Sequence, residues 1–267
     1  MLKRADMLLV ESGLAPSRER AKALIMEGVV YYGEVKVMKG SDQFPEDASL
    51  TVRENPIPFV SRGGLKLDKA VRKYGIDLNG AVCVDVGAST GGFTDCMLQN
   101  GARHVYAVDV GYGQLDWKLR NDPRVTCMER RNAREMEPSW FEEIPDFASC
   151  DVSFISIRLI LPRMFECLKD KGRAVVLVKP QFEAGRGKVG KNGVVREEST
   201  HREVLISAAE YASACGFSIL ALDHSPIKGP KGNIEYLMYL EKTDEKAEFD
   251  IKSQAESVVS LSHEELM

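Results

Sequence analysis

The chain has 267 residues, of which 44% are hydrophobic and 28% are charged, and its formal net charge at pH 7 is −4. This length suits one large α/β domain with a small additional unit, and the composition is that of a soluble globular protein. No apolar run approaches the roughly 18 residues that a membrane-spanning helix needs, and residues 1–6 lack the apolar core of a signal peptide. Six scattered Cys residues without C-x-x-C pairs indicate reduced thiols and therefore a cytoplasmic protein.

The negative charge is concentrated towards the C-terminal end of the chain. The segment from Glu241 to Met267 holds three Lys and eight acidic residues, so the remainder carries a formal charge of +1. An RNA partner would therefore have to bind local basic patches, because the overall charge does not attract it.

Residues 1–54 have the pattern of a separate unit. Residues 4–10 predict a short amphipathic helix, and a second helix begins after the N-cap residue Ser17 and ends at Gly28. Residues 29–37 predict a β-hairpin. The second helix places three basic side chains on exposed positions: Arg18, Arg20 and Lys22. They form either a solvated helix face or a set of phosphate contacts, which position RNA without reading its sequence.

The two helices, with the sequence APSRERAKALIMEG at the second, and the hairpin after them resemble the small RNA-binding domain of ribosomal protein S-four and of pseudouridine synthases. In that family the second helix and its basic residues face RNA. The resemblance implies that the N-terminal unit binds RNA, with Arg18, Arg20 and Lys22 as phosphate contacts.

Residues 55–60 contain two prolines and predict a stiff linker. Strand and helix patterns then alternate over residues 61–242, which predicts a doubly wound, Rossmann-like α/β sheet. The predicted strands are 82–86, 104–108, 124–128, 146–151, 173–179, 216–223 and 234–240. The predicted helices lie near 66–74, 93–100, 114–120, 157–169 and 200–214. The last two strands are joined by a loop too short for a crossover helix, so the final strand is predicted to be antiparallel.

Residues 82–94 predict a ligand site. Their β-branched start is typical of a strand buried on both faces, and a glycine-rich turn and a helix pattern follow it. Such a turn brings backbone N–H groups and a helix N-terminus close to a ligand. Asp109 ends the next strand, where a carboxylate can accept hydrogen bonds from both hydroxyls of a ribose. For the turn alone, a tight connection without a ligand is the alternative.

The turn, D-V-G-A-S-T-G-G, lacks the G-x-G-x-x-G pattern of dinucleotide sites and resembles the cofactor loop of S-adenosylmethionine-dependent methyltransferases. The resemblance implies S-adenosyl-L-methionine as the cofactor, with Gly87 and Gly91 near its methionine part and Asp109 at its ribose. The candidate cofactor-binding residues are Asp85, Gly87, Ala88, Ser89, Gly91, Gly92, Phe93, Asp109 and, by position alone, Asn132.

Four polar residues stand at unusual places for a structural role. Lys66 lies in the helix before the first strand, Asp151 and Lys179 end predicted strands, and Glu235 begins the last strand. Because the carboxyl ends of parallel strands form the ligand crevice, Asp151 and Lys179 are expected to converge beside the glycine turn. An antiparallel last strand would bring Glu235 to the same edge. Taken singly, each of the four could equally form an ordinary surface ion pair.

In order and setting these four residues resemble the K-D-K-E tetrad of FtsJ-type ribose 2′-O-methyltransferases. With the N-terminal unit and the motifs SRGGLKLDKA and VKPQFE, the chain up to about residue 242 resembles the TlyA family, also called hemolysin A. The resemblance implies a seven-stranded methyltransferase sheet and methylation of ribose 2′-hydroxyls of ribosomal RNA. It also implies ribosomal RNA or ribosomal subunits as partners.

A ribose hydroxyl is a poor nucleophile at neutral pH, so this reaction needs a base that removes its proton. We assign Lys179 as the base and Lys66 as the neighbouring cation that lowers the pKa of Lys179. Asp151 is assigned to orient Lys179, and Glu235 to hold Lys66 or the ribose. No metal is expected.

Three other functions fit parts of the sequence. A membrane-active cytolysin is opposed by the lack of a signal peptide, a membrane span or a strongly hydrophobic amphipathic helix. An RNA-binding protein with a non-catalytic cofactor pocket is opposed by the four intact polar residues. A small-molecule methyltransferase would leave the N-terminal unit unexplained.

The remaining segments give weaker predictions. Residues 180–198 show no core pattern and predict a mobile basic loop near the substrate. Residues 243–267 predict an acidic tail with a possible helix over 251–261. Trp117 and Trp140 are expected to pack in the protein rather than stack on bases. Three dispersed histidines are expected to be structural: His104, His201 and His224.

Overall fold

The computed structural model describes residues 2–53, 57–190, 192–229, 231–245 and 248–266. The chain separates into two compact units, residues 1–62 and residues 63–267. The division lies close to the proline-containing stretch that the sequence predicts as a linker. Of the helices that the structure describes, none is both long enough and apolar enough to cross a bilayer.

The N-terminal unit combines two helices with short antiparallel strands. Its elements are β1 (Leu2–Arg4), α1 (Ala5–Glu11), α2 (Arg18–Glu27), β2 (Val30–Tyr32), β3 (Val35–Lys36), β4 (Gln43–Pro45) and β5 (Leu50–Val52). Strand β2 pairs with β3 and β5, and β1 pairs with β4. Ser17 caps α2, since its side chain accepts a hydrogen bond from Arg20 N at 3.2 Å, as predicted.

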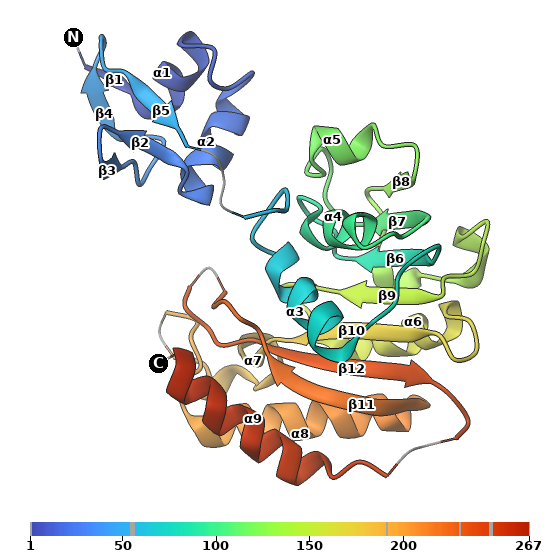
Figure 1. Cartoon of the computed structure of the whole chain (residues 1–267). Coiled ribbons are helices and arrows are strands. Elements are labelled where there is room, and N and C mark those ends of the chain that lie inside the picture. The colour runs from blue at the N-terminus through green and yellow to red at the C-terminus, as the bar shows by residue number, and fades with distance from the viewer. Residues whose placement is uncertain (1, 54–56, 191, 230, 246–247, 267) are drawn as a thin grey trace. The chain divides into compact units, whose positions relative to one another are not determined.

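The second unit is built on a seven-stranded sheet, which confirms the predicted fold class (Figure 1). Its strands are β6 (Val82–Val86), β7 (His104–Val108), β8 (Val125–Met128), β9 (Phe147–Cys150), β10 (Arg173–Val178), β11 (Phe217–His224) and β12 (Tyr236–Lys242). They lie in the order β11-β12-β10-β9-β6-β7-β8. As predicted, β12 runs antiparallel to both of its neighbours, while the other pairs are parallel.

Helices cover both faces of this sheet (Figure 1). They are α3 (Gly64–Tyr74), α4 (Gly92–Gln99), α5 (Trp117–Arg120), α6 (Leu161–Cys167), α7 (Pro180–Glu183), α8 (Glu198–Ala214) and α9 (Ile251–Leu266), with short 3-10 helices η1 (Ala133–Glu135), η2 (Pro138–Trp140), η3 (Ile157–Leu159) and η4 (Arg186–Lys188). Alternate strand residues such as Val82, Val84 and Val86 are buried in one core with α6, α8 and α9. Asp85 has the opposite orientation and contacts Thr94 of α4.

The register of the sheet explains how residues distant in sequence reach one edge. Strand β10 is paired so that Val178 lies opposite Tyr236 of β12. Lys179, which follows β10, and Glu235, which precedes β12, therefore leave the sheet side by side. Asp151 follows β9, the neighbour of β10 on its other side. The carboxyl ends of β9 and β10 and the start of β12 thus meet at one edge, as expected for a ligand crevice.

The segment that the sequence sets apart as an acidic tail contains α9, which is longer than the possible helix over 251–261. In Figure 1, α9 runs alongside α8 on the same face of the sheet, and it also contacts β11. Its inward side chains, among them Ala255 and Val259, are buried in the core that α6 and α8 share. The helix is therefore part of the sheet-and-helix layers.

Candidate active site

Lys66 stands at the centre of a chain of buried ion pairs. Its Nζ lies 2.7 Å from Glu235 Oε2 and 3.1 Å from Asp151 Oδ2, and it donates a hydrogen bond to each. Only 9% of the Lys66 side chain and 2% of the Glu235 side chain are exposed. Both groups are thus taken out of water, and their charges are neutralised within the protein.

The helix that carries Lys66 is held on the sheet by a second ion cluster. Asp223 of β11 accepts hydrogen bonds from Lys69 at 3.0 Å and from Lys73 at 2.9 Å, both on α3. Burial alone would raise the pKa of Asp223, but the two lysines more than compensate and the pKa is lowered. With Leu67 buried beneath it, α3 has a fixed rotation that points Lys66 at the strand ends.

Lys179 joins the same chain from its other end. Its Nζ lies 2.5 Å from Asp151 Oδ1 and donates a hydrogen bond to Ser153 Oγ at 2.9 Å. Lys179 itself is 6% exposed. Asp151 therefore bridges the two lysines, with one carboxylate oxygen towards each. The structure brings together all four of the polar residues that the sequence selects.

The electrostatics of these ion pairs favour the charged forms of Lys66 and Asp151. Burial works against the ammonium of Lys66, but the carboxylates of Asp151 and Glu235 outweigh it and raise the pKa of Lys66. Burial likewise works against the carboxylate of Asp151, yet the two neighbouring lysines hold the pKa of Asp151 below its usual range. Lys66 is thus fixed as a cation and Asp151 as an anion.

A cavity of about 360 Å³ opens beside these ion pairs. Asp151 lines it, as do four of the predicted cofactor residues: Gly87, Ser89, Asp109 and Asn132. At Gly87 the backbone has a φ of +84°, and a Cβ would lie 2.8 Å from the carbonyl oxygen of Asp151. A side chain there would therefore push the glycine turn away from the β9 end, which explains the need for glycine.

Asp109 is anchored at the cavity wall by the glycine turn itself. Its Oδ2 accepts a hydrogen bond from Ser89 N at 2.8 Å, and its Oδ1 accepts one from Gly111 N at 2.7 Å. Each oxygen keeps a second lone pair for a ligand hydroxyl. Asn132 also borders the cavity, but its Oδ1 accepts from Arg134 N and caps η1. A carboxylate for a ribose diol and apolar walls from Val108, Ile155 and Ile160 suit a nucleoside-containing cofactor.

Five predicted cofactor residues are not among the described residues that line this cavity: Asp85, Ala88, Gly91, Gly92 and Phe93. Asp85 is fully buried, and its carboxylate accepts hydrogen bonds from Thr94 Oγ1 at 2.7 Å and from Ser149 Oγ at 3.0 Å. Burial raises its pKa to about 6. Gly91 adopts a φ of +95° where Leu119 leaves no room for a Cβ. Asp85 and Gly91 therefore support the turn through contacts with other parts of the domain.

The cavity also has walls that the sequence analysis did not single out. They are Val110, Gln114, Arg131 and the segment that follows Asp151, residues 152–155. Within that segment Phe154 is 90% exposed, has a φ of +64° and lies with its ring centroid 5.2 Å from that of Phe182. A left-handed backbone is strained for a bulky residue, and such strain is concentrated at functional sites. In the sequence, the alternation of serine with apolar residues in V-S-F-I-S, directly after Asp151, was the available signal.

The predicted RNA contacts of the N-terminal unit differ in their surroundings. Arg18 Nη2 donates to Asp6 Oδ2 at 3.1 Å, so its guanidinium also stabilises the unit itself. Asp6 is fully buried, and its hydrogen bonds with Arg4 and Arg18 lower its pKa to about 2 against the effect of burial. Lys22 is exposed and Arg20 is half-buried.

Two of the remaining predictions need revision. The stretch expected to be a loop without regular structure, residues 180–198, begins with α7 and contains η4. It also contains Val195, which is 2% exposed and whose backbone N–H donates a hydrogen bond to Asn233 Oδ1. Trp117 is 75% exposed rather than packed, while Trp140 does pack on the core.

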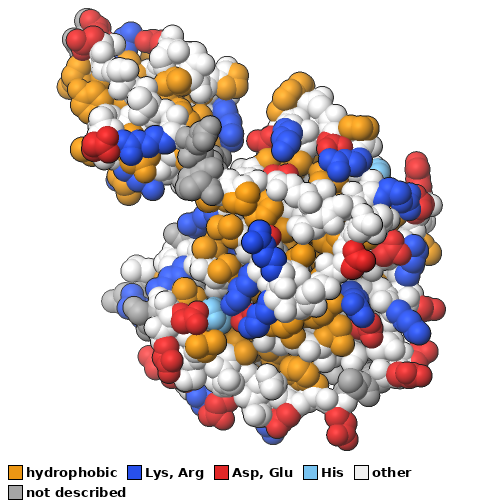
Figure 2. Space-filling model, viewed as in Figure 1, with side chains coloured by type: hydrophobic (Ala, Val, Ile, Leu, Met, Phe, Trp, Pro, Cys, Tyr) orange, Lys and Arg blue, Asp and Glu red, His pale blue; other side chains and the backbone are white. Residues whose placement is uncertain are grey.

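On the visible face of the larger unit, basic and acidic side chains are interspersed (Figure 2).

Comparisons with known proteins agree with this geometry. Residues 59–242 match the FtsJ-like methyltransferase family. The chain is 44% identical over 237 residues to hemolysin A of Brachyspira hyodysenteriae, covering 88% of this chain and 98% of that protein. It is 41% identical over 245 residues to the 16S/23S rRNA (cytidine-2′-O)-methyltransferase TlyA of Mycobacterium tuberculosis, covering 91% of each.

Solved structures show the same likeness. A hemolysin-related protein from Streptococcus thermophilus superposes with a TM-score of 0.80 at 48% identity, covering 99% of this chain and 96% of the other. A protein from Listeria monocytogenes, assigned to the S-adenosylmethionine-dependent methyltransferases, gives a TM-score of 0.51 at 14% identity. It covers 67% of this chain and 98% of its own, and it shows the fold alone.

Proposed function

The chain belongs to the TlyA/hemolysin A family and has an FtsJ-like methyltransferase domain, and we propose that it methylates ribose 2′-hydroxyls of ribosomal RNA. It is an S-adenosylmethionine-dependent methyltransferase by this membership. The observation that carries the choice of a ribose hydroxyl is the buried chain Glu235–Lys66–Asp151–Lys179 at the mouth of the cofactor cavity.

The cavity residues fit the cofactor. Asp109 would hold the ribose hydroxyls, and the backbone of the turn at Gly87 would lie against the methionine part. Val108, Ile155 and Ile160 would enclose the adenine, with Asn132 at its edge. When bound, the cofactor supplies a methyl group on a sulfonium that already activates it for transfer.

The remaining task of the protein is to place and deprotonate the ribose oxygen. In this proposal Lys179 Nζ would accept the proton of the ribose hydroxyl, whose oxygen takes the methyl group that the cofactor would supply. Asp151 holds Lys179 at this point, with Ser153 as a second contact. Lys66 is already committed to Asp151 and Glu235 as a cation, so it serves as a fixed positive charge beside the base.

The substrate class is carried over from relatives. The Mycobacterium tuberculosis relative is named for cytidine 2′-O-methylation of 16S and 23S rRNA, and a Campylobacter jejuni relative, 34% identical, for that of 23S rRNA. We extend ribosomal RNA, or the ribosomal subunits that contain it, to this chain. The N-terminal unit would bind RNA phosphates through Arg18, Arg20 and Lys22. The same substrate would place the protein in the cytoplasm.

Transfer of labelled methyl to unmodified bacterial ribosomal subunits tests the proposal. Wild type is expected to label RNA at a site that then resists alkaline cleavage, because a 2′-O-methyl group blocks attack on the neighbouring phosphate. Lys179→Ala is expected to bind the cofactor but to transfer no label. Lys169→Ala, which removes an exposed lysine paired with Asp146, serves as the matched control. Wild type that binds the cofactor but labels neither subunits nor free ribosomal RNA would contradict the proposal.

A further inference from the structure

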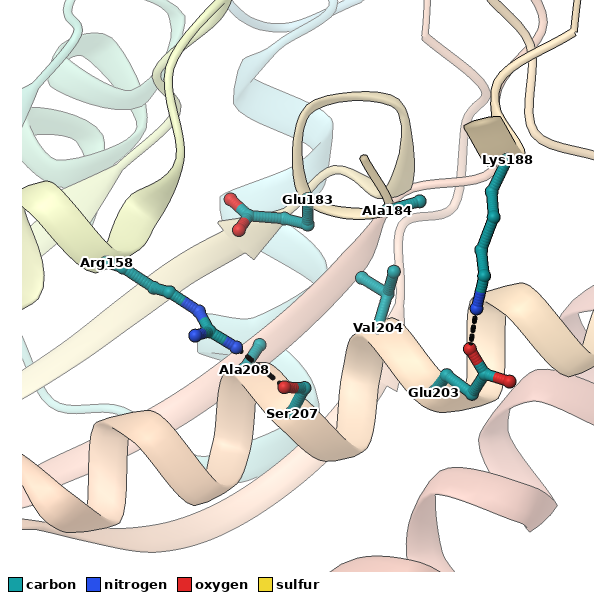
Figure 3. Close-up of a pocket in the computed structure, with 8 residues that line it drawn as sticks. All are labelled: Arg158, Glu183, Ala184, Lys188, Glu203, Val204, Ser207 and Ala208. Atoms are coloured by element: carbon teal, nitrogen blue, oxygen red, sulfur yellow. Dashed lines mark hydrogen bonds and ion pairs between the residues drawn. The ribbon is translucent and has the colours of Figure 1, made fainter. Parts of the chain in front are cut away.

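Glu183 links the two strand ends that carry Asp151 and Lys179. It is the last residue of α7, the short helix that begins directly after Lys179. Its Oε2 accepts a hydrogen bond from Ser156 Oγ at 2.7 Å, and its Oε1 accepts one from Ile157 N at 2.8 Å. Figure 3 shows its carboxylate turned away from Lys188 and Glu203, which pair on the other side of the same pocket.

Both partners of Glu183 belong to the segment that follows β9, residues 151–157. The same segment carries Asp151 and Ser153, the two groups that contact Lys179 Nζ. It also supplies residues 152–155 to the wall of the cofactor cavity. The segment 151–157 therefore contacts Lys179 near its N-terminal end and Glu183 near its C-terminal end. Because α7 connects these two residues, the contacts form a closed loop.

We propose that Glu183 is a positioning residue for Lys179, an inference that rests on the proposed methyl transfer. Lys179 and Glu183 lie at opposite ends of α7, so the carboxylate fixes the segment 151–157 relative to the lysine. Loss of this contact would let Asp151 and Ser153 shift away from Nζ. The glutamate in the motif VKPQFE then has a role, although it does not touch the reacting atoms.

The chemistry of the contact suits a carboxylate. Ile157 N and Ser156 Oγ lie at the start of η3, where backbone N–H groups have no partner within the helix. A carboxylate accepts from both at once. The segment also contains Phe154 with its φ of +64°, and strained backbone persists only where the surrounding contacts over-determine it. Glu183 is one of those contacts, and the ring of Phe182 is another.

The test compares Glu183→Ala and Glu183→Gln with Glu203→Gln, a neutralised carboxylate from the same pocket that contacts only Lys188 among these groups. We expect kcat for methyl transfer to fall about 10- to 100-fold in Glu183→Ala, because displacement of a catalytic group by about 1 Å has effects of this size. Glu183→Gln should lose only a few-fold, since its amide oxygen can still accept from Ile157 N. Glu203→Gln should match wild type.

A double variant separates positioning from a purely structural role. If Glu183 acts through Lys179, Glu183→Ala adds no further loss to the residual kcat of a Lys179→Arg background. The acid limb of the kcat–pH profile should also move in Glu183→Ala. A kcat and pH profile equal to those of wild type, with only a lower melting temperature, would overturn the inference.

A crystal structure of Glu183→Ala gives a readout that does not depend on the substrate. We expect the segment 151–157 to be displaced and Lys179 Nζ to have left Ser153 Oγ. An unmoved segment would overturn the inference even if the wild type methylated RNA. Conversely, a displaced segment together with a wild-type protein that labels no RNA would overturn the proposed function and leave the link between Glu183 and Lys179 established.

Discussion

Lys66 and Glu235 are 169 positions apart in the sequence, yet the lysine Nζ lies 2.7 Å from Glu235 Oε2 in the interior of the domain. Neither side chain could be buried alone, because an isolated charge in the interior costs several kcal/mol. Their pairing, together with Asp151, therefore fixes α3, the end of β9 and the start of β12 relative to one another.

Removing one partner of this pair should lower the free energy of unfolding more than removing both. Lys66→Met would leave the carboxylate of Glu235 buried without a cation, so we expect the free energy of unfolding to fall by about 3 kcal/mol. The double variant Lys66→Met/Glu235→Leu should recover part of that stability. Methyl transfer should be lost in both. Denaturant unfolding and labelled methyl transfer measure the two effects, and a double variant less stable than Lys66→Met would contradict this account.

Lys179→Arg separates a base from a positive charge. Arginine keeps the ion pair with Asp151 but does not lose its proton at accessible pH, so it cannot accept one. We expect kcat to fall by about 10²- to 10⁴-fold, the range typical of a lost general base, while cofactor affinity stays within a few-fold. Lys169→Arg, at an exposed lysine paired with Asp146, is the matched control. Activity above a tenth of wild type in Lys179→Arg would mean that the lysine acts only through its charge.

Asp109 and Asp85 should respond differently to the same change. Asp109→Asn replaces an acceptor at the cavity wall by an amide, so cofactor affinity should fall about 10- to 100-fold, the size of one or two hydrogen bonds to a charged group. Asp85→Asn, behind the turn and bonded to Thr94 and Ser149, should change affinity by less than a few-fold. Titration calorimetry with S-adenosylmethionine checks both. Equal losses would place Asp85 in the cofactor site.

The fold was predictable because its signals are local. Strands β6 and β7 begin and end where their β-branched runs predict, and the loop before β12 is too short for a parallel connection. The contrast between Asp85 and Asp109 shows where local signals stop. Both are acidic residues near the carboxyl ends of neighbouring strands. Asp85 lies within β6 and faces Thr94 of α4, whereas Asp109 follows β7 and lines the cavity.

The four polar residues could be selected from the sequence because each stands at the end of a predicted element. The contacts that hold these residues in place could not be predicted from the sequence. Glu183 meets Ser156 across 27 positions, and nothing in either segment alone indicates that pairing. The left-handed backbone of Phe154 is likewise set by its surroundings, because a Phe in isolation disfavours it.

A last prediction concerns the buried contact between α8, β12 and α9. His201 of α8 is 1% exposed, and its Nδ1 lies 3.0 Å from the hydroxyl of Tyr236 and 2.9 Å from His263 Nε2 on α9. Its Nε2 lies 3.1 Å from the carbonyl oxygen of Val195. Burial, with His263 nearby, lowers the pKa of His201 to about 4. Folding therefore keeps His201 neutral where the unfolded chain would be protonated.

The sign of the pH dependence follows from that difference. Between about pH 6.5 and pH 4 the unfolded state binds the extra proton at His201, so stability falls as the pH is lowered, by at most about 1.4 kcal/mol per pH unit. Asp85, with a pKa raised to about 6, has the opposite effect on stability, but it is present in both wild type and the variant His201→Gln. We therefore expect His201→Gln to lose less stability than wild type between pH 7 and pH 5, measured by denaturant unfolding. Parallel pH profiles for the two proteins would show that His201 is not held neutral by its contacts with Tyr236 and α9.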